Sequence, residues 1–567
     1  MINFFRLNSR VKKILPKKFR EMIPLFYIIS IFSLLLDVFS IALIVPLFIS
    51  LFDQSSEHSF FAIEFVNNNK LLSVAVVVLI FVLKNFISIK INQYISKVVY
   101  KLGSEYSNTI IKKYLLGNYA YFKKQKKSTV IKEIIFVAND FVTNILLSIN
   151  TIFSELSLLI LIAFIGLYFN AVITILSIVL FASIILISRH YNKVSTNLIN
   201  NQLSEDYDTN VSNLMNVLNG YMSIKSPKLI HHFLYIFKSS NKALNEKYAK
   251  IHAKRINASK QTEIMIVLAF CCMYIYFFFL ASEDVDILVI LSVFSVLLFK
   301  AIPSLNRLSI AMVNMNSYDY TIDIIESKIE TETLANNYTP LVFNNAINLR
   351  NISFSYKTGE PIIDNLSLTI QKGQFIAISG TSGVGKTTLL NIISKLINPS
   401  SGDIFLDDTR LTESNKYNYF NLITYLTQKP FIYEGTIIQN LILDDDDEVK
   451  HHEVNELLST LKILETIQKL PNQINEYIGL EGNNLSGGEL QRICIARAML
   501  QKSQILILDE ATNNLDQETE KAVFKSLKKY AIENNVTVIS VSHHQENLDV
   551  YDSVIDLSNL KKVLDEV

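Results

Sequence analysis

The strongest constraint on the fold is a set of six long apolar runs within the first 320 residues. A helix needs about 20 apolar residues to cross the hydrocarbon core of a bilayer, and each run is close to that length or longer. Half of all residues are hydrophobic, which is a high share for a soluble protein. The predicted membrane-spanning helices cover residues 22–52, 71–89, 141–169, 171–188, 263–281 and 286–305. We therefore expect a six-helix, all-α membrane domain over residues 1–330.

The distribution of Lys and Arg predicts how this domain is oriented. Seven of the first 21 residues are Lys or Arg, whereas residues 53–70, between the first two spans, have Lys70 as their only Lys or Arg. Basic residues favour the cytoplasmic side. We therefore expect a multi-pass protein of the inner (plasma) membrane with both termini in the cytoplasm. The segments 90–140 and 189–260 between spans have helical composition, and such length favours cytoplasmic helical extensions over loops.

Several ionisable residues fall inside the predicted spans, among them an Asp, a Lys and a Glu well away from the ends of their spans. Asp37, Lys84 and Glu155 would be costly in contact with lipid, so we expect them to face the bundle interior or each other. One interpretation is that they line a cavity for a polar or charged substrate. The alternatives are internal ion pairs and, for Lys84, an ammonium that reaches the membrane interface.

The charge balance bears on possible partners. The formal net charge is +1, so no basic field favours nucleic acid, and we expect no nucleic-acid partner. The three cysteines have neither the spacing of a zinc site nor the number typical of a disulfide scaffold.

The pattern changes after about residue 330. Residues 331–341 read as a polar linker, and residues 342–567 alternate short β-rich runs with helical segments, which is typical of an α/β domain. Within "FIAISGTSGVGKTTLLNII" a predicted strand, a glycine loop and a helix start match the P-loop pattern G-x-x-x-x-G-K-[ST]. We expect Lys386 to reach the phosphates of ATP and the Thr387 hydroxyl to bind Mg²⁺. The predicted phosphate-binding residues are Gly380, Thr381, Ser382, Gly383, Val384, Gly385, Lys386, Thr387 and Thr388.

A second motif, "QILILDEAT" at 504–512, predicts a buried parallel strand that ends in two acids. We expect Asp509 to hold Mg²⁺ and Glu510 to polarise an attacking water. A third motif, "EGNNLSGGELQRICIARAML" at 481–500, places a Gly-Gly pair at a predicted helix start, where backbone N–H groups favour an anion. The chain thus has two predicted anion-binding loops about a hundred residues apart.

The P-loop, "LSGGE" and "LDEAT", in this order, resemble the ATP-binding cassette of ABC transporters, and six spans before one cassette resemble an exporter-type half-transporter. The resemblance implies that Tyr356 stacks on adenine and that Gln428 touches Mg²⁺. It also implies that Asp516 belongs to the D-loop and that His543 contacts the γ-phosphate. Glu510, His543 and Gln428 are thereby the implied catalytic residues.

The resemblance also implies an answer to the pair of anion-binding loops, since in this family each ATP lies between the P-loop of one cassette and the signature loop of another. The implied partner is a second copy of the chain, with a heterodimer as the alternative. The signature loop comprises Leu485, Ser486, Gly487, Gly488 and Glu489.

The sequence departs from the family pattern in several places. Glu489 stands where Gln is usual, which adds a negative charge near the nucleotide unless its side chain points away. Asn513 and Asn514 replace the usual Ser and Ala before the D-loop aspartate, His544 follows the switch histidine, and Leu480 precedes the signature segment. These departures leave every core catalytic group in place.

The expected function is ATP-driven export or flipping of an amphipathic substrate. "DVFSIALIVPLF" in the first span and "FFAIEF" in the loop after it resemble bacterial lipid-linked oligosaccharide flippases, so we expect a lipid-linked glycan or another lipid. A peptide or drug exporter is the alternative, followed by an importer and by an ATP-gated regulator that transports nothing.

Overall fold

The structure is a computed structural model of residues 1–567. It describes the chain except for residues 1, 23, 26, 27, 30, 34, 37–69, 118, 280–286, 330–340, 357–360, 444–449, 480–484, 542–549 and 559–567. Asp37, His543, His544, Leu480, most of the first predicted span and nearly all of the predicted linker lie outside the described residues. The chain forms two compact units, residues 1–117 with 122–332 and residues 333–567 with 118–121, and each is described by itself.

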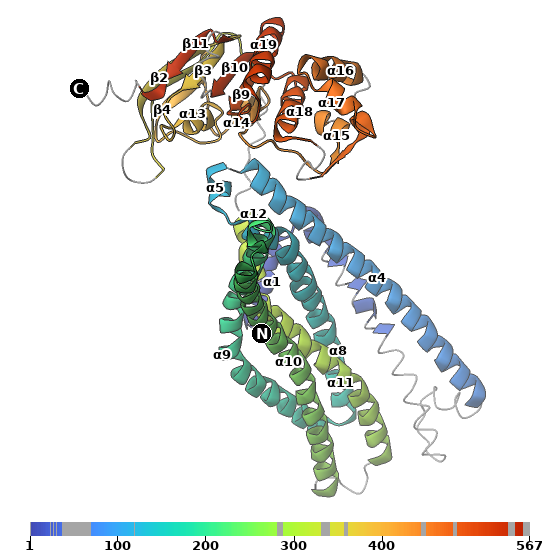
Figure 1. Ribbon diagram of the computed structural model, residues 1–567. Helices are drawn as coiled ribbons and strands as arrows, with labels where there is room; N and C mark the ends of the chain where they lie inside the picture. The colour runs from blue at the N-terminus through green and yellow to red at the C-terminus, as the bar shows by residue number, and fades with distance from the viewer. Residues whose placement is uncertain are drawn as a thin grey trace. The chain divides into compact units, whose positions relative to one another are not determined.

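The first unit is helical, as the apolar runs predict (Figure 1). Its long helices α4, α9 and α10 extend far beyond the predicted spans that they contain, which fits the expected helical extensions. The α-helices of this unit are α1 (Ile2–Ile14), α4 (Lys70–Leu116), α6 (Lys127–Ile131), α7 (Ala138–Asp140), α8 (Leu147–Phe169), α9 (Ala171–Asn219), α10 (Pro227–Phe279), α11 (Ile287–Ser317) and α12 (Tyr320–Ile329). The short helix α5 (Tyr119–Lys124) follows α4, two π-helical turns are η1 (Lys132–Val137) and η2 (Phe141–Leu146), and η3 (Ser223–Lys225) is a 3-10 turn.

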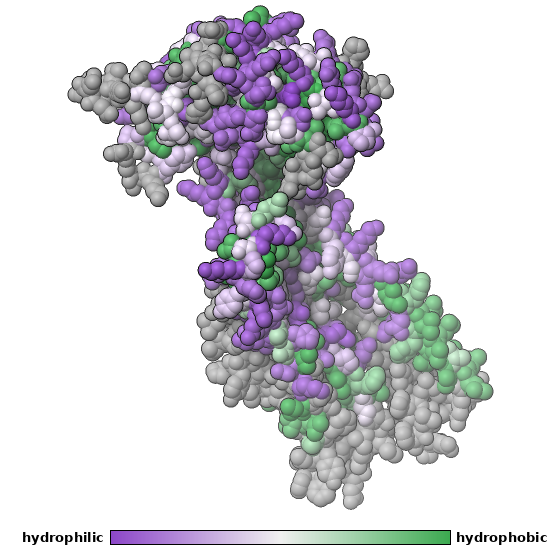
Figure 2. Space-filling model, in the orientation of Figure 1, coloured by the Kyte–Doolittle hydropathy of each residue, from purple (hydrophilic) through white to green (hydrophobic). Residues whose placement is uncertain are grey.

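Apolar surface identifies the membrane-spanning part of this unit. Three stretches of described residues are long and apolar enough to cross a bilayer, namely Val74–Leu116, Lys127–Phe169 and Val293–Ser317. The first half of α4 exposes Leu71, Leu79 and Phe86, among others, and Figure 2 shows apolar side chains gathered there. Because such a surface is unfavourable in water, it fits contact with lipid.

The second unit is an α/β domain with a five-stranded parallel sheet in the order β11-β3-β10-β9-β6 and a four-stranded antiparallel sheet in the order β2-β1-β4-β5. The strands are β1 (Ala346–Phe354), β2 (Ile363–Gln371), β3 (Phe375–Ser379), β4 (Ser401–Leu406), β5 (Thr409–Arg410), β6 (Ile423–Leu426), β7 (Gly435–Thr436), β8 (Tyr477–Ile478), β9 (Ile505–Asp509), β10 (Thr537–Val541) and β11 (Ser553–Asp556). The helices are α13 (Lys386–Ile393), α14 (Lys416–Phe420), α15 (Ile437–Leu441), α16 (Lys450–Thr460), α17 (Leu464–Gln468), η4 (Gln473–Asn475), α18 (Gly487–Leu500) and α19 (Gln517–Asn534).

The parallel sheet has a hydrophobic core on each face. Along β9, Ile505 and Ile507 pack into the cluster that contains α13, while Leu506 and Leu508 pack into the cluster that contains α18 and α19. Every residue of β9 is buried, as the aliphatic run predicts for a parallel strand covered on both sides. Helices α13 and α18 therefore pack on opposite faces of the same sheet.

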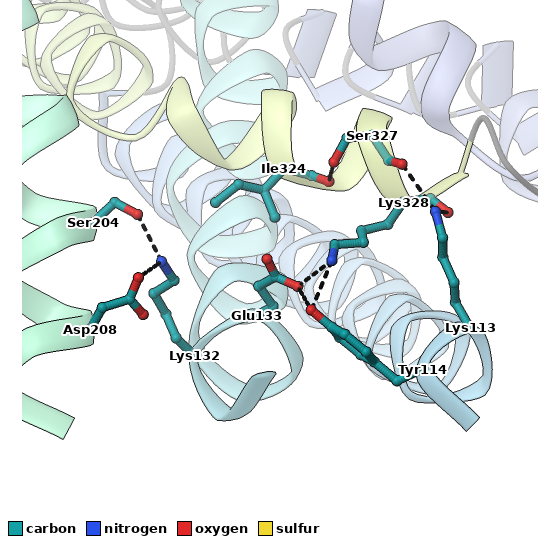
Figure 3. A network of polar contacts seen from close by, with 9 residues as sticks. All are labelled: Lys113, Tyr114, Lys132, Glu133, Ser204, Asp208, Ile324, Ser327 and Lys328. Atoms are coloured by element: carbon teal, nitrogen blue, oxygen red, sulfur yellow. Dashed lines mark hydrogen bonds and ion pairs between the residues drawn. The ribbon is translucent and has the colours of Figure 1, made fainter. Parts of the chain in front are cut away.

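A buried polar network joins three helices of the first unit (Figure 3). The ammonium of Lys328 on α12 lies 2.8 Å from a carboxylate oxygen of Glu133 on η1 and donates to the Tyr114 hydroxyl on α4, also at 2.8 Å. The Tyr114 hydroxyl donates in turn to Glu133. Lys113 donates to the carbonyls of Ser327 and Lys328 at the end of α12. The network fixes α12, the last helix before the predicted linker, to α4 and η1.

We expect Lys328→Met to lower the free energy of unfolding by about 3 kcal/mol, because Glu133 would keep its charge in a buried position without its ammonium partner. The double variant Glu133→Gln with Lys328→Met should lose less than Lys328→Met alone, since no unpaired charge is left. Denaturant titration of the purified full-length protein in detergent, followed by circular dichroism, measures both.

Lys242→Met is the matched control, because its pair with Glu246 is exposed and such pairs contribute little. A double variant that loses as much as Lys328→Met, or more, would contradict the assignment of the loss to a buried unpaired charge.

Candidate functional site

The predicted nucleotide residues meet at one edge of the parallel sheet, where the strands end. The P-loop follows β3, Asp509 and Glu510 stand at the end of β9, and Gln428 lies just beyond β6. Because these strands are parallel, their carboxyl ends point to the same edge, which is where ligands bind in open α/β sheets. The sheet thus brings together residues up to 130 positions apart.

The P-loop adopts a conformation that depends on glycine. Gly385 has φ +114°, and a Cβ at this position would lie 2.8 Å from Cγ2 of Ile362. Any L-residue would be strained at this φ and would also clash with Ile362. The side chain of Lys386, at the start of α13, folds back over the loop. Its ammonium donates to the carbonyls of Gly380 (2.8 Å) and Thr381 (3.3 Å).

Asp509 is held by two hydroxyl groups at the end of β9. Thr387 Oγ1 donates to Asp509 Oδ1 at 3.1 Å, and the Tyr425 hydroxyl donates to Oδ2 at 3.2 Å. Burial raises the pKa of Asp509 above its ordinary value and the negative charge of Glu510 adds to this, although both hydrogen bonds and the Lys386 charge oppose the rise. Two of the three residues predicted to hold Mg²⁺, Thr387 and Asp509, are therefore in direct contact.

Glu510 leaves the sheet in an unusual backbone conformation. Its φ is +53°, in the left-handed region that non-glycine residues rarely adopt. Its carboxylate oxygen Oε2 accepts hydrogen bonds from two neutral amides, Nε2 of Gln428 and Nδ2 of Asn513, each at 2.7 Å. Backbone strain of this kind is concentrated at functional sites, which agrees with the role predicted for Glu510.

The side chains at this edge suit a magnesium nucleotide. A hydroxyl, a carboxylate and an amide are ligand types that Mg²⁺ accepts, and Mg²⁺ is usually held by one or two carboxylates together with phosphates and water. The ammonium of Lys386 and the N–H groups at the start of α13 suit phosphate oxygens. Thr387, Asp509 and Gln428 are the residues that would hold the metal.

Tyr356, predicted to contact adenine, and Asp516, predicted to belong to the D-loop, are two further residues of the predicted nucleotide site. The Tyr356 ring is half exposed, packs edge-on against Phe354, and has its hydroxyl 3.3 Å from the Thr388 hydroxyl on α13. Its position next to the P-loop helix suits the predicted contact with adenine.

Asp516 caps α19, and the hydrogen bond from the Thr519 N–H holds the pKa of Asp516 below its ordinary value.

The signature loop starts α18 with a reciprocal cap. Ser486 Oγ accepts the Glu489 N–H at 3.3 Å, and the Glu489 carboxylate turns back to accept the Ser486 N–H at 2.6 Å. The carboxylate of Glu489, the acid that stands where the family pattern has Gln, therefore caps its own helix. Gly487 and Gly488 pack against Asn514, which follows the end of β9.

Of the three charged residues singled out in the predicted spans, the two that the structure describes, Lys84 and Glu155, each contact another side chain. Glu155 on α8 forms a two-pronged ion pair with Arg307 on α11, with N···O distances of 2.5 and 3.1 Å, which is the alternative interpretation stated for it. Lys84 is buried on α4 with its ammonium 5.3 Å from the centre of the Phe81 ring. A cavity of about 450 Å³ between α8, α9 and α11 is lined mainly by apolar side chains, such as Leu159, Phe294 and Leu298. Substrate contact by Glu155 or Lys84 stays a prediction.

Three residues that take part in the contacts described above were not predicted from the sequence to do so. Tyr425 was one of many tyrosines, and only the pairing of β6 with β9 brings its hydroxyl to Asp509. Asn513 was noted as a departure from the family pattern but not as a partner of Glu510. Arg307 lies just beyond the sixth predicted span, and a basic residue at that position was the available signal for a partner of Glu155.

The two signature glycines should differ in their tolerance of a side chain. A Cβ at Gly488 would lie 2.9 Å from the backbone oxygen of Asn514, whereas one at Gly487 would lie 3.4 Å from its side-chain nitrogen. We expect Gly488→Ala to lower the free energy of unfolding by about 1–3 kcal/mol, because backbone must move. Gly487→Ala should be neutral or slightly stabilising, since alanine favours the helix.

Denaturant unfolding of the two variants measures the difference. Equal stability of Gly487→Ala and Gly488→Ala would contradict the close packing of Gly488 on Asn514.

The comparisons with known proteins agree with this geometry. Residues 363–513 match the family model described as ABC transporter. A putative export ATP-binding/permease protein of Rickettsia bellii is 36% identical over 224 residues, which cover 39% of this chain and 38% of that protein. The mesentericin transport/processing ATP-binding protein MesD of Leuconostoc mesenteroides is 35% identical over 222 residues (39% and 30%). The ABC multidrug transporter atrC of Emericella nidulans is 36% identical over 213 residues (35% and 17%).

These alignments thus cover well under two thirds of the relatives' own length. A solved structure extends the likeness to the whole fold. The structure of a bacterial Atm1-family ABC exporter with ATP bound superimposes with a TM-score of 0.76 at 18% identity, over 99% of this chain and 97% of that one. Residues 363–513 therefore match the ABC transporter family model, and the chain as a whole has the fold of that exporter, a helical membrane domain followed by an α/β domain.

Proposed function

We propose that the chain is one half of an ATP-driven exporter, in which ATP hydrolysis at the edge of the parallel sheet drives an amphipathic substrate across the membrane. The observation that carries the proposal is the convergence of Lys386, Thr387, Asp509, Glu510 and Gln428 on that edge. A chain that only binds ATP as a switch needs no carboxylate for water activation. Glu510 therefore favours turnover over a regulator that transports nothing.

The opposite placement of α13 and α18 supports a dimer. The P-loop helix and the signature helix pack on different faces of the sheet, which suits two helix starts that serve different nucleotides. A second copy, facing the first, would bring its signature loop to the first P-loop and complete two composite ATP sites. We propose a homodimer, with a heterodimer as the alternative.

The hydrolytic step follows from the positions of the side chains. Water attacks the γ-phosphorus, the bond to the bridging oxygen breaks, and the Glu510 carboxylate orients the water and accepts its proton. Mg²⁺, when bound, neutralises charge that develops on the phosphate oxygens. Because export requires ATP to favour one arrangement of the dimer over the other, ATP must bind the closed dimer more tightly than the open one.

The relatives bear on the substrate class. The names of the three relatives above refer to export, mesentericin transport and multidrug transport. These descriptions favour a peptide or a drug-like molecule over the lipid-linked glycan that the first span suggests. The apolar cavity between α8, α9 and α11 supports an occupant with substantial apolar surface. We accordingly propose an amphipathic peptide or drug as the substrate, handled in a bacterial cytoplasmic membrane with both termini in the cytoplasm.

The test is the ATPase rate of the purified full-length protein in lipid nanodiscs, for wild type and Glu510→Gln. We expect Glu510→Gln to lower kcat by at least about 100-fold, because the amide cannot accept the proton of water. Glu533→Gln is the matched control and should keep the wild-type rate, since Glu533 lies exposed on α19.

The same assay with an amphipathic peptide, a cationic drug and a polyprenyl-pyrophosphate glycan identifies the substrate class. We expect the peptide or the drug to change the wild-type rate. Stimulation by the glycan alone would reject the proposed substrate class, and a wild type without turnover would reject the self-sufficient homodimer.

A further inference from the structure

Glu510 is held by a residue that the family pattern does not assign. Asn513 stands where serine is usual, three residues after Glu510, in the turn between β9 and α19. Its amide nitrogen Nδ2 donates to Glu510 Oε2 at 2.7 Å, and its backbone N–H donates to the Glu510 carbonyl at 3.3 Å. The side chain and the backbone of Asn513 therefore both contact Glu510.

The turn that carries Asn513 is itself firmly anchored. The Leu515 N–H donates to the Thr512 carbonyl at 2.9 Å, and the Thr512 hydroxyl donates to the buried Glu520 at 2.8 Å. The Asn514 N–H donates to Gln491 on α18 at 3.1 Å. These bonds fix the direction from which the Asn513 side chain approaches Glu510.

We propose that Asn513 is a positioning residue for ATP hydrolysis, whose amide holds the Glu510 carboxylate in the orientation that receives the attacking water. The inference rests on the proposed function, because it assigns Asn513 a part in that hydrolysis. Displacement of a catalytic group by about 1 Å can cost about 100-fold in rate, and a partly exposed carboxylate on a flexible side chain needs such an anchor.

A neutral amide suits this role better than a cation. A Lys or Arg partner would hold the carboxylate strongly but would also stabilise its charge against accepting a proton. A neutral amide donates a hydrogen bond that orients the carboxylate and places no positive charge beside it. Gln428 offers a second amide to the same oxygen, so Asn513 and Gln428 hold Glu510 from two separate elements.

The competing explanation is that Asn513 only stabilises the turn. Asn and Asp are both favoured in turns, because their side-chain oxygens bond to nearby backbone. Only Asn carries an NH₂ group that can donate to a carboxylate. Asn513→Asp therefore separates the two roles, since it preserves size and turn chemistry but removes the donor and places like charges in contact.

The experiment measures kcat and KM for ATP in nanodiscs for wild type, Asn513→Ala, Asn513→Asp and Asn398→Ala. We expect Asn513→Ala to lower kcat about tenfold with KM within about twofold, because orientation and not binding is lost. Asn513→Asp should lower kcat at least as much. Asn398→Ala removes an amide–carboxylate bond of 2.6 Å to Glu413, away from the site, and should keep the wild-type kcat.

Thermal unfolding of the same variants checks that the fold is intact. A wild-type kcat in Asn513→Asp, or a fall in kcat matched by an equal loss of folded protein, would overturn the inference and leave the proposed function standing. A wild type that does not hydrolyse ATP would overturn the proposed function, and the role of Asn513 with it.

Discussion

The burial of β9 on both faces is the constraint on which the rest of the ATPase domain depends. Its side chains alternate between two cores, so a shift in register by one residue would exchange the residues of both cores at once. The pairing with β10 and β6 is fixed in consequence, and with it the position at which the strand ends. Asp509 is the last residue of that strand and Glu510 the first outside it. The positions of the two acids proposed to act in ATP hydrolysis are thus fixed by the packing of residues earlier in the strand.

The same packing places the P-loop helix and the signature helix on opposite faces of the sheet. Helices α13 and α18 each begin with exposed backbone N–H groups, and each needs an apolar face of the sheet to cover its buried side. The sheet covers one of these helices on each face. Symmetric association of two copies is the simplest arrangement that pairs the start of α18 with a P-loop.

Local patterns predicted much of this from the sequence. The glycine spacing of the P-loop, the aliphatic run of β9 and the acids after it each predict their structure because the cause lies within a few residues. The pairing of Glu155 with Arg307 could not be derived in this way, since 152 positions separate them and only the contact between α8 and α11 joins them. The orientation of Glu489 was also open, because the sequence allows the carboxylate to face either the nucleotide or its own helix cap. Local hydrogen bonding to Ser486 decides between the two.

The carboxylates Glu133 and Glu155 of the helical unit and Glu510 of the α/β unit have different kinds of hydrogen-bond partner, and the difference fits their roles. Glu133 and Glu155 in the helical unit are paired with Lys328 and Arg307, because a carboxylate removed from water must be neutralised. Glu510, which the proposed function requires to react, stays partly accessible to water and has no cation among its hydrogen-bond donors described above. Two amides hold it instead. The charge of the partner is therefore a useful guide to the role of a carboxylate: a cation suits structural pairing, and a neutral donor suits an acid that must react.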